Sequence, residues 1–228
     1  GKVDTLAVRL PSAVSILLIT LLVYGYSSTF LSPVGAFAAG AAYATMGQVM
    51  ELGRLGETDA MFALFVTGSL LLWHWGFSRQ WKPSLTWGLA WLCVALGTLT
   101  KGLQAPVYFV MSVSVYLVVI RKWRFTVSWA NVFGILVFAL VWGSWQLPFY
   151  LKMGMKGTRH IYGGDVSIYL RNWGLVSILK HYPTYPFEIF GCLLPWSAFF
   201  LAFIHREIRR TIRPINQNLL FLLISLAV

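Results

Sequence analysis

Long apolar runs dominate this chain of 228 residues and constrain its fold more than any other feature. About seven of the runs approach the ~20 consecutive apolar residues that a helix needs to cross a bilayer. Only 11% of the residues are charged, whereas soluble domains carry about 25% charged residues. We therefore predict an all-α fold, a polytopic integral membrane bundle that forms a single transmembrane domain over residues 1–228.

The hydropathy pattern predicts about seven complete spans and one truncated span, with boundaries accurate to about 2–4 residues. The last apolar run ends with the chain, and no leader with a cleavage site precedes the first span, so we expect a segment of a longer protein. The stretch 150–186 is expected to be a long extracytoplasmic loop, and Trp73 and Trp75 to anchor their span at the membrane interface. The complete spans are expected near residues 11–31, 34–50, 60–77, 85–100, 103–120, 128–149 and 187–205, and the truncated span from about residue 218.

The positive charges predict which loops face the cytoplasm, because Lys and Arg in short loops are retained on that side. Half of the 18 basic residues are concentrated in short loops at 78–84, 121–127 and 206–217, which hold one acid, Glu207. The other half are spread over longer segments together with all the remaining acids. We therefore place the dense loops in the cytoplasm and expect a plasma (inner) membrane protein with its active face outward. The net charge of +11 then reflects topology and attraction to membrane lipids, and nucleic acid is not an expected partner.

A polar insert between two spans gathers several charged residues between Glu51 and Asp59. Lys101 stands between two other spans, and the expected topology brings it to the same outer face. Ionisable groups at membrane depth are costly unless they are paired or line a wet cavity. Arg54 and Lys101 are therefore candidates to bind a donor phosphate, Arg through a bidentate fork and Lys as a point charge. The alternatives are that Arg54 pairs with Glu51 along a helix and that Lys101 snorkels from a helix end.

Three further residues are candidates for catalysis or metal binding. Asp59 begins a span after Thr58, so it is either a first-turn acid of a helix or an accessory catalytic residue that orients a basic group or contacts the acceptor. Glu51 and His160 are candidate ligands of a divalent metal ion, the cofactor that these residue types allow. The alternatives are an ion pair between Glu51 and Arg54 and an ordinary surface histidine.

Four short motifs follow one another along the chain and carry a resemblance to a known family. They are Arg9-Leu10-Pro11-Ser12-Ala13, then Glu51-Leu52-Gly53-Arg54 followed by Thr58-Asp59-Ala60, then Leu99-Thr100-Lys101-Gly102, and finally Tyr185-Pro186 followed by Leu194-Pro195-Trp196-Ser197. In this order, and with these span positions, they resemble the membrane core of the C-type (GT-C) glycosyltransferases. The specific resemblance is to the branch of protein O-mannosyltransferases and lipid A aminoarabinose transferases, and it covers nearly the whole chain.

The resemblance implies an inverting hexosyl or pentosyl transferase. Such an enzyme moves a sugar from a polyprenyl-phosphate sugar donor to a lipid, glycan or protein acceptor on the outer side of the membrane. In this family the main catalytic carboxylate lies in a first outer loop, upstream of the motif that begins at Arg9. The chain is therefore expected to lack that loop, the N-terminal span and the C-terminal part, and to be inactive alone. Asp4 is not expected to replace the missing carboxylate.

Two further expectations bear on function. The loop at 150–186 is long and rich in glycine near its start, so it is expected to act as a lid that closes over bound donor lipid. The competing function is a transporter or flippase subunit, which would also place charged residues in a membrane bundle. Transporters usually bind near the membrane midplane on broken helices. Here the charges gather at span ends on one side, which favours the transferase.

Overall fold

The computed structural model describes residues 4–172, 184–199 and 217–227. This part of the chain is built from helices and contains no β-strand, which confirms the all-α fold. In chain order the elements are α1 (Thr5–Ser27), α2 (Pro33–Ala44), α3 (Gly47–Arg54), α4 (Asp59–Ser78), α5 (Pro83–Lys101), α6 (Gln104–Val119), the short 3-10 helix η1 (Trp123–Phe125), α7 (Trp129–Asn172), α9 (Tyr185–Cys192) and α11 (Gln217–Ala227).

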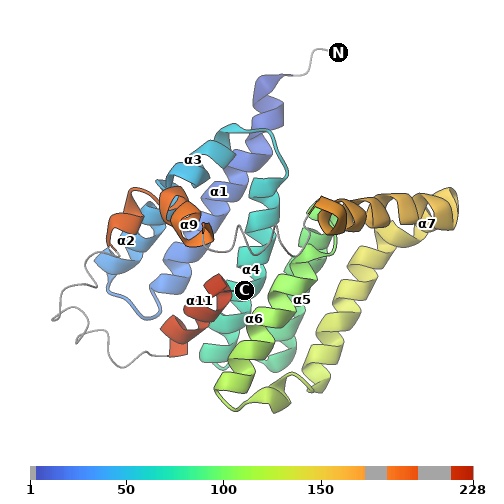
Figure 1. The fold of residues 1–228 in the computed structure, drawn as a ribbon. Helices are drawn as coiled ribbons and strands as arrows, with labels where there is room; N and C mark the ends of the chain where they lie inside the picture. Colours follow the sequence, from blue (N-terminus) through green and yellow to red (C-terminus); the bar gives the residue numbers. More distant parts are fainter. Residues whose placement is uncertain (1–3, 173–183, 200–216, 228) are drawn as a thin grey trace.

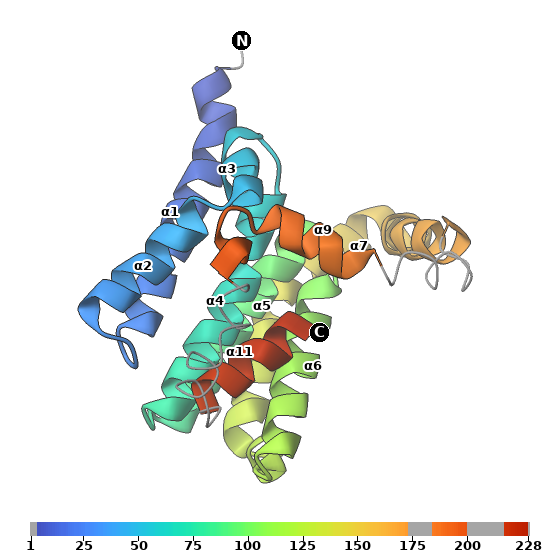
Figure 2. The ribbon, with the colours of Figure 1, turned by 60° about the vertical axis from the view of Figure 1, so that its left-hand side comes forward.

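Four helical segments in the described residues are long and apolar enough to cross a membrane: α1, α4, α5 and the part of α7 from Trp129 to Met155. They overlap the spans predicted at 11–31, 60–77, 85–100 and 128–149, with boundaries that differ by up to six residues. A fifth apolar helix, α6, has 16 residues and is slightly shorter than these four. Figures 1 and 2 show these helices running alongside one another, with α5 packed against both α4 and α7.

The bundle has two ends of different character. We call them the Lys101 end, where α4 begins and α5 finishes, and the Arg121 end, where α4 finishes and α6 leads into α7. Figure 1 shows α3 and the start of α1 at the Lys101 end. The structure therefore groups the polar insert with Lys101, as the alternation of spans predicts.

The prediction of a single span at residues 34–50 is wrong. This segment forms two short helices, α2 of 12 residues and α3 of 8 residues, and 12 helical residues reach only about 18 Å. The helix breaks at Thr45 and Met46 because a distant segment supplies alternative partners there. The indole of Trp196 donates to the hydroxyl of Thr45 at 2.7 Å, and the amide of Gly47 donates to the carbonyl of Leu194 at 3.0 Å.

The stretch that we expected to be a loop from residue 150 is helical as far as Asn172. Its backbone departs from helical geometry at Gly154, where φ is 66°, a left-handed conformation that glycine adopts without strain. Figure 1 shows α7 changing direction after its membrane-spanning part. The expected span at 187–205 corresponds to α9, which ends at Cys192, and residues 200–205 lie outside the described part of the chain.

An aromatic core fills the bundle towards the Arg121 end. Trp73, Trp87 and Tyr116 are fully or almost fully buried and meet edge to face, with ring centroids 5.6 and 6.1 Å from that of Trp73. The prediction that Trp73 anchors the membrane interface is therefore wrong, because its side chain packs inside the bundle. Neighbouring His74 is also buried, and its ring nitrogens hydrogen-bond the hydroxyls of Tyr26 at 2.8 Å and Tyr116 at 3.2 Å.

The close packing of α5 against α7 fixes the position of α5. The indole of Trp91 on α5 donates to the side-chain carbonyl of Asn131 on α7 at 2.8 Å. Gly134, one turn further along α7, lies so close to the backbone of Trp87 that a side chain there would have no room. Because α5 ends at Lys101, this contact also determines where that lysine is presented.

Candidate functional site

The candidate site is centred on an ion pair between two neighbouring helix ends. The ammonium of Lys101 lies 2.6 Å from a carboxylate oxygen of Asp59. Asp59 is the first residue of α4, and Lys101 is the last residue of α5. The helix ends there because Gly102 adopts a φ of 87°, which disfavours any residue with a side chain. The two candidates are 42 residues apart in sequence and meet directly in the structure.

The charge of each side chain is also stabilised by the dipole of the helix to which it belongs. A carboxylate in the first turn of a helix and an ammonium in the last turn both complement the helix dipole. Both side chains remain 39% exposed, so this is a wet ion pair and not a buried one. The lysine has three N–H donors and the carboxylate accepts one of them, which leaves donors for a further anion. Phe62 lies beneath the ammonium, with its ring centre 6.0 Å from Nζ.

Arg54 lies at the same end of the bundle, in the last turn of α3. Its side chain is exposed and makes no ion pair with any other residue that the structure describes. The alternative pairing between Arg54 and Glu51 is therefore not formed. Glu51 is exposed as well, one turn earlier on α3. Within the described ranges, Arg54 is a cation at the membrane surface whose charge is not neutralised by a neighbouring carboxylate.

The polar insert is held against α1 by contacts that sequence reasoning missed. The hydroxyl of Ser12, which is 2% exposed, donates to the backbone carbonyl of Glu57 at 3.1 Å. At Gly53 and Gly56 the insert approaches α1 so closely that an added Cβ would collide with side chains of that helix. The only signal in the sequence was the position of Ser12 within the Arg9 motif and the two glycines in the insert. These contacts fix the segment that carries Arg54 and Asp59.

The predicted metal site at Glu51 and His160 stays a prediction, because only Glu51 has a side chain in the described part of the chain. No group of three or more His, Cys, Asp or Glu residues is placed there to hold an ion. Glu51 is solvent-exposed, and the His160 side chain lies outside what the structure describes, although its backbone belongs to α7. Asp4 acts as the N-cap of α1 and accepts a hydrogen bond from the amide of Leu6 at 3.1 Å.

Comparison with known proteins identifies the family of the chain. Residues 1–145 match the model of the family described as dolichyl-phosphate-mannose-protein mannosyltransferase. A curated relative, the undecaprenyl phosphate-alpha-4-amino-4-deoxy-L-arabinose arabinosyl transferase 2 of Proteus mirabilis (strain HI4320), is 32% identical over 116 residues. That alignment covers 48% of this chain and 21% of the relative, so the chain matches about a fifth of that protein's length. No solved structure matches. The family match includes Arg54, Asp59 and Lys101, and the chain belongs to the dolichyl-phosphate-mannose-protein mannosyltransferase family of membrane glycosyltransferases.

Proposed function

We propose that the protein to which this chain belongs transfers a sugar from a polyprenyl-phosphate sugar to a lipid, glycan or protein acceptor, on the extracytoplasmic face of the plasma membrane. The observation that carries the proposal is the Lys101–Asp59 pair at the end of the bundle that also holds Arg54. The family supports the reaction class, and the names of the family and of the relative both include a lipid phosphate.

The chemistry needs positive charge at the donor phosphate. In the reaction, an acceptor atom gives up its proton to a base and bonds to the anomeric carbon, and the bond from that carbon to the phosphate oxygen breaks. The electron pair of the broken bond stays on the lipid phosphate, which gains negative charge as it leaves. We infer that transfer proceeds with inversion, because the acceptor attacks opposite the departing phosphate. Cations fixed in advance where that charge develops stabilise the transition state.

Lys101 and Arg54 are assigned to this task. Lys101 offers its remaining N–H donors to the phosphate, and Asp59 acts as a positioning residue that holds the ammonium at the end of α5. Arg54 can grip two phosphate oxygens through its planar fork.

The test is sugar transfer by the full-length protein from a polyprenyl-phosphate sugar. Lys101→Met and Arg54→Met remove the charge and keep a long side chain, and each should lower transfer by about 10²-fold, as removal of one charge-stabilising donor does. Lys82→Met is the matched control, because Lys82 is an exposed lysine at the other end of α5 from Lys101. It should leave transfer unchanged.

The role of Asp59 is tested by a measurement that separates positioning from stability. Asp59→Asn should reduce kcat by about tenfold or more, because a misplaced catalytic group is costly. Asp59→Glu should recover part of that loss. The free energy of unfolding should change by only about 0.2–1 kcal/mol, the usual contribution of an exposed ion pair. Parental transfer rates in both the Lys101→Met and Arg54→Met proteins would refute the phosphate-binding role.

A further inference from the structure

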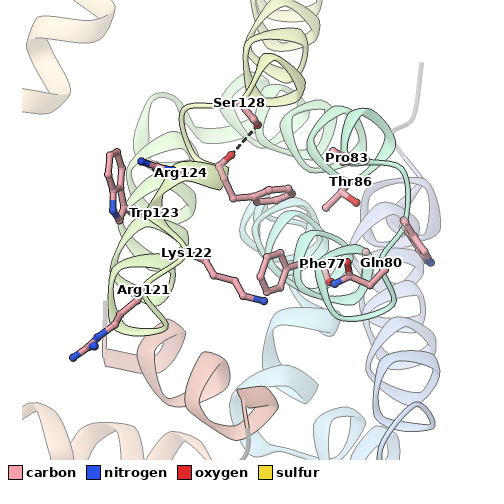
Figure 3. Close-up of a pocket in the computed structure, with 12 residues that line it drawn as sticks. Phe77, Gln80, Pro83, Thr86, Arg121, Lys122, Trp123, Arg124 and Ser128 are labelled. Carbon is pink, nitrogen blue, oxygen red and sulfur yellow. Dashed lines mark hydrogen bonds between the residues drawn. The ribbon is translucent and has the colours of Figure 1, made fainter.

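A cavity of about 810 Å³ lies at the Arg121 end of the bundle, at the opposite end of α5 from Lys101. Its walls come from the end of α4, the start of α5 and the connection between α6 and α7. None of the candidate site residues lines it. Figure 3 shows the cavity from the Arg121 end, with the helix termini arranged around it. The proposed transfer reaction makes no use of this space.

The side chains of the α6–α7 connection make the cavity basic. Arg121, Lys122 and Arg124 all line it. In Figure 3 the Lys122 side chain reaches across the opening towards Phe77, and its ammonium lies 5.3 Å from the centre of that ring. Figure 3 also shows Arg121 projecting outward from the rim. Among the described residues, none of the three cations forms an ion pair with a carboxylate.

The positive character comes from these side chains and not from helix dipoles. Helices α5 and α7 begin at this end, and α4 and α6 finish here, so two positive and two negative helix termini offset one another. One of the first amides of α7 is also satisfied, since the hydroxyl of Ser128 accepts from the amide of Asn131 at 3.3 Å. A ligand would therefore meet the basic side chains above an aromatic wall that includes Phe77 and Phe125.

We propose that this cavity binds the phosphate headgroup of an anionic phospholipid. The cavity has the volume of a small-molecule site, far larger than a free phosphate ion requires. It combines three cations with apolar walls, which suits a phosphodiester attached to glycerol and acyl chains. It lies at the ends of helices that are long enough to cross a membrane, which is the depth of the lipid headgroups. Basic pockets between transmembrane helices are a recurring arrangement for binding anionic lipid.

The test uses the full-length protein, purified in detergent and titrated with short-chain phosphatidylglycerol. Phosphatidylcholine with the same chains and inorganic phosphate are the comparison ligands, and binding is followed by native mass spectrometry. Each cation near a headgroup contributes about a fivefold change in affinity, so Lys122→Gln with Arg124→Gln should weaken phosphatidylglycerol binding by about 30-fold. Lys122→Arg keeps the charge and should retain the parental affinity.

The matched control removes two positive charges from the same end of the bundle without touching the cavity. Arg79→Gln with Lys82→Gln is suitable, because neither residue lines the cavity. This control should change the affinity by threefold or less. Equal binding of phosphatidylglycerol and phosphatidylcholine would overturn the proposal, as would equal losses in the two double variants. Displacement of the lipid by equimolar inorganic phosphate would overturn the assignment to a lipid headgroup. Sugar transfer is measured separately, so failure here leaves the proposed function intact.

Discussion

Replacing Gly134 with alanine should destabilise the bundle, although alanine is the better helix former. A Cβ at this position would overlap the ring of Trp91 and lie 2.9 Å from the carbonyl oxygen of Trp87. The carbonyl belongs to the backbone of α5 and cannot rotate away. The indole of Trp91 is held by its hydrogen bond to Asn131 and by an edge-to-face contact with Phe109, whose ring centre lies 5.3 Å away. The helices must therefore separate.

The magnitude follows from two opposing terms. Glycine to alanine in a helix gains about 1 kcal/mol from backbone propensity. Overpacking a filled interface costs about 1–3 kcal/mol, and here backbone atoms stand in the way, so the upper part of that range applies. We expect a net loss of about 1–2 kcal/mol in the free energy of unfolding. The change should also displace α5 and with it Lys101.

Gly143→Ala on the same helix is the control. An added Cβ at Gly143 meets no atom within 4 Å, so only the propensity gain remains. The assay is unfolding of the full-length protein in mixed micelles, followed by tryptophan fluorescence and by circular dichroism. Gly143→Ala should be as stable as the parent or more stable. A Gly134→Ala protein that unfolds at the same denaturant level as Gly143→Ala would refute the packing argument.

Two further predictions concern topology and the buried histidine. With the native cysteines of the full-length protein replaced by serine, Thr58→Cys should react with an impermeant thiol reagent on intact cells and Ser84→Cys should not, because the basic loops are expected in the cytoplasm. The reverse labelling pattern would invert the topology. His74→Leu should lower the free energy of unfolding by about 1–3 kcal/mol, since it leaves the hydroxyls of Tyr26 and Tyr116 buried without their partner. Tyr26→Phe should lower it by about 0.6 kcal/mol, which is typical of one such hydrogen bond in a membrane protein. Unfolding in mixed micelles measures both, and parental stability of the His74→Leu protein would contradict the role given to His74.

Hydropathy predicted the long helices well because a membrane-spanning helix needs only length and apolar composition. It failed at residues 34–50, where the average over the segment is apolar throughout. The break at Thr45 and Met46 depends on two hydrogen bonds: the Trp196 indole donates to Thr45, and the Leu194 carbonyl accepts from the amide of Gly47. Both partners lie about 150 residues further along the chain. A window along the sequence contains no information about such partners. The same limit explains Trp73, whose burial depends on rings from several other helices.

The sequence predicted that the candidate site residues lie on the same side of the membrane, but it did not predict which of them touch. Alternation of spans places Asp59 and Lys101 on one side of the membrane, and the two side chains carry opposite charges. Their pairing at 2.6 Å requires α4 and α5 to be antiparallel neighbours in the right register, which packing determines. The pairing of Arg54 with Glu51 was a reasonable local alternative at a spacing of three residues, yet α3 presents the two side chains to solvent without joining them.

The length of α5 separates the two cationic ends of the molecule. Its 19 residues rise about 28 Å, close to the ~30 Å thickness of the hydrocarbon layer. A phosphate at Lys101 and a phosphate at Lys122 would therefore belong to lipids of opposite leaflets. Neither headgroup can pass to the other end without carrying its charge through hydrocarbon. The protein would respond to the lipid composition of each leaflet independently, and changing the anionic lipid content of one leaflet would alter occupancy at one end alone.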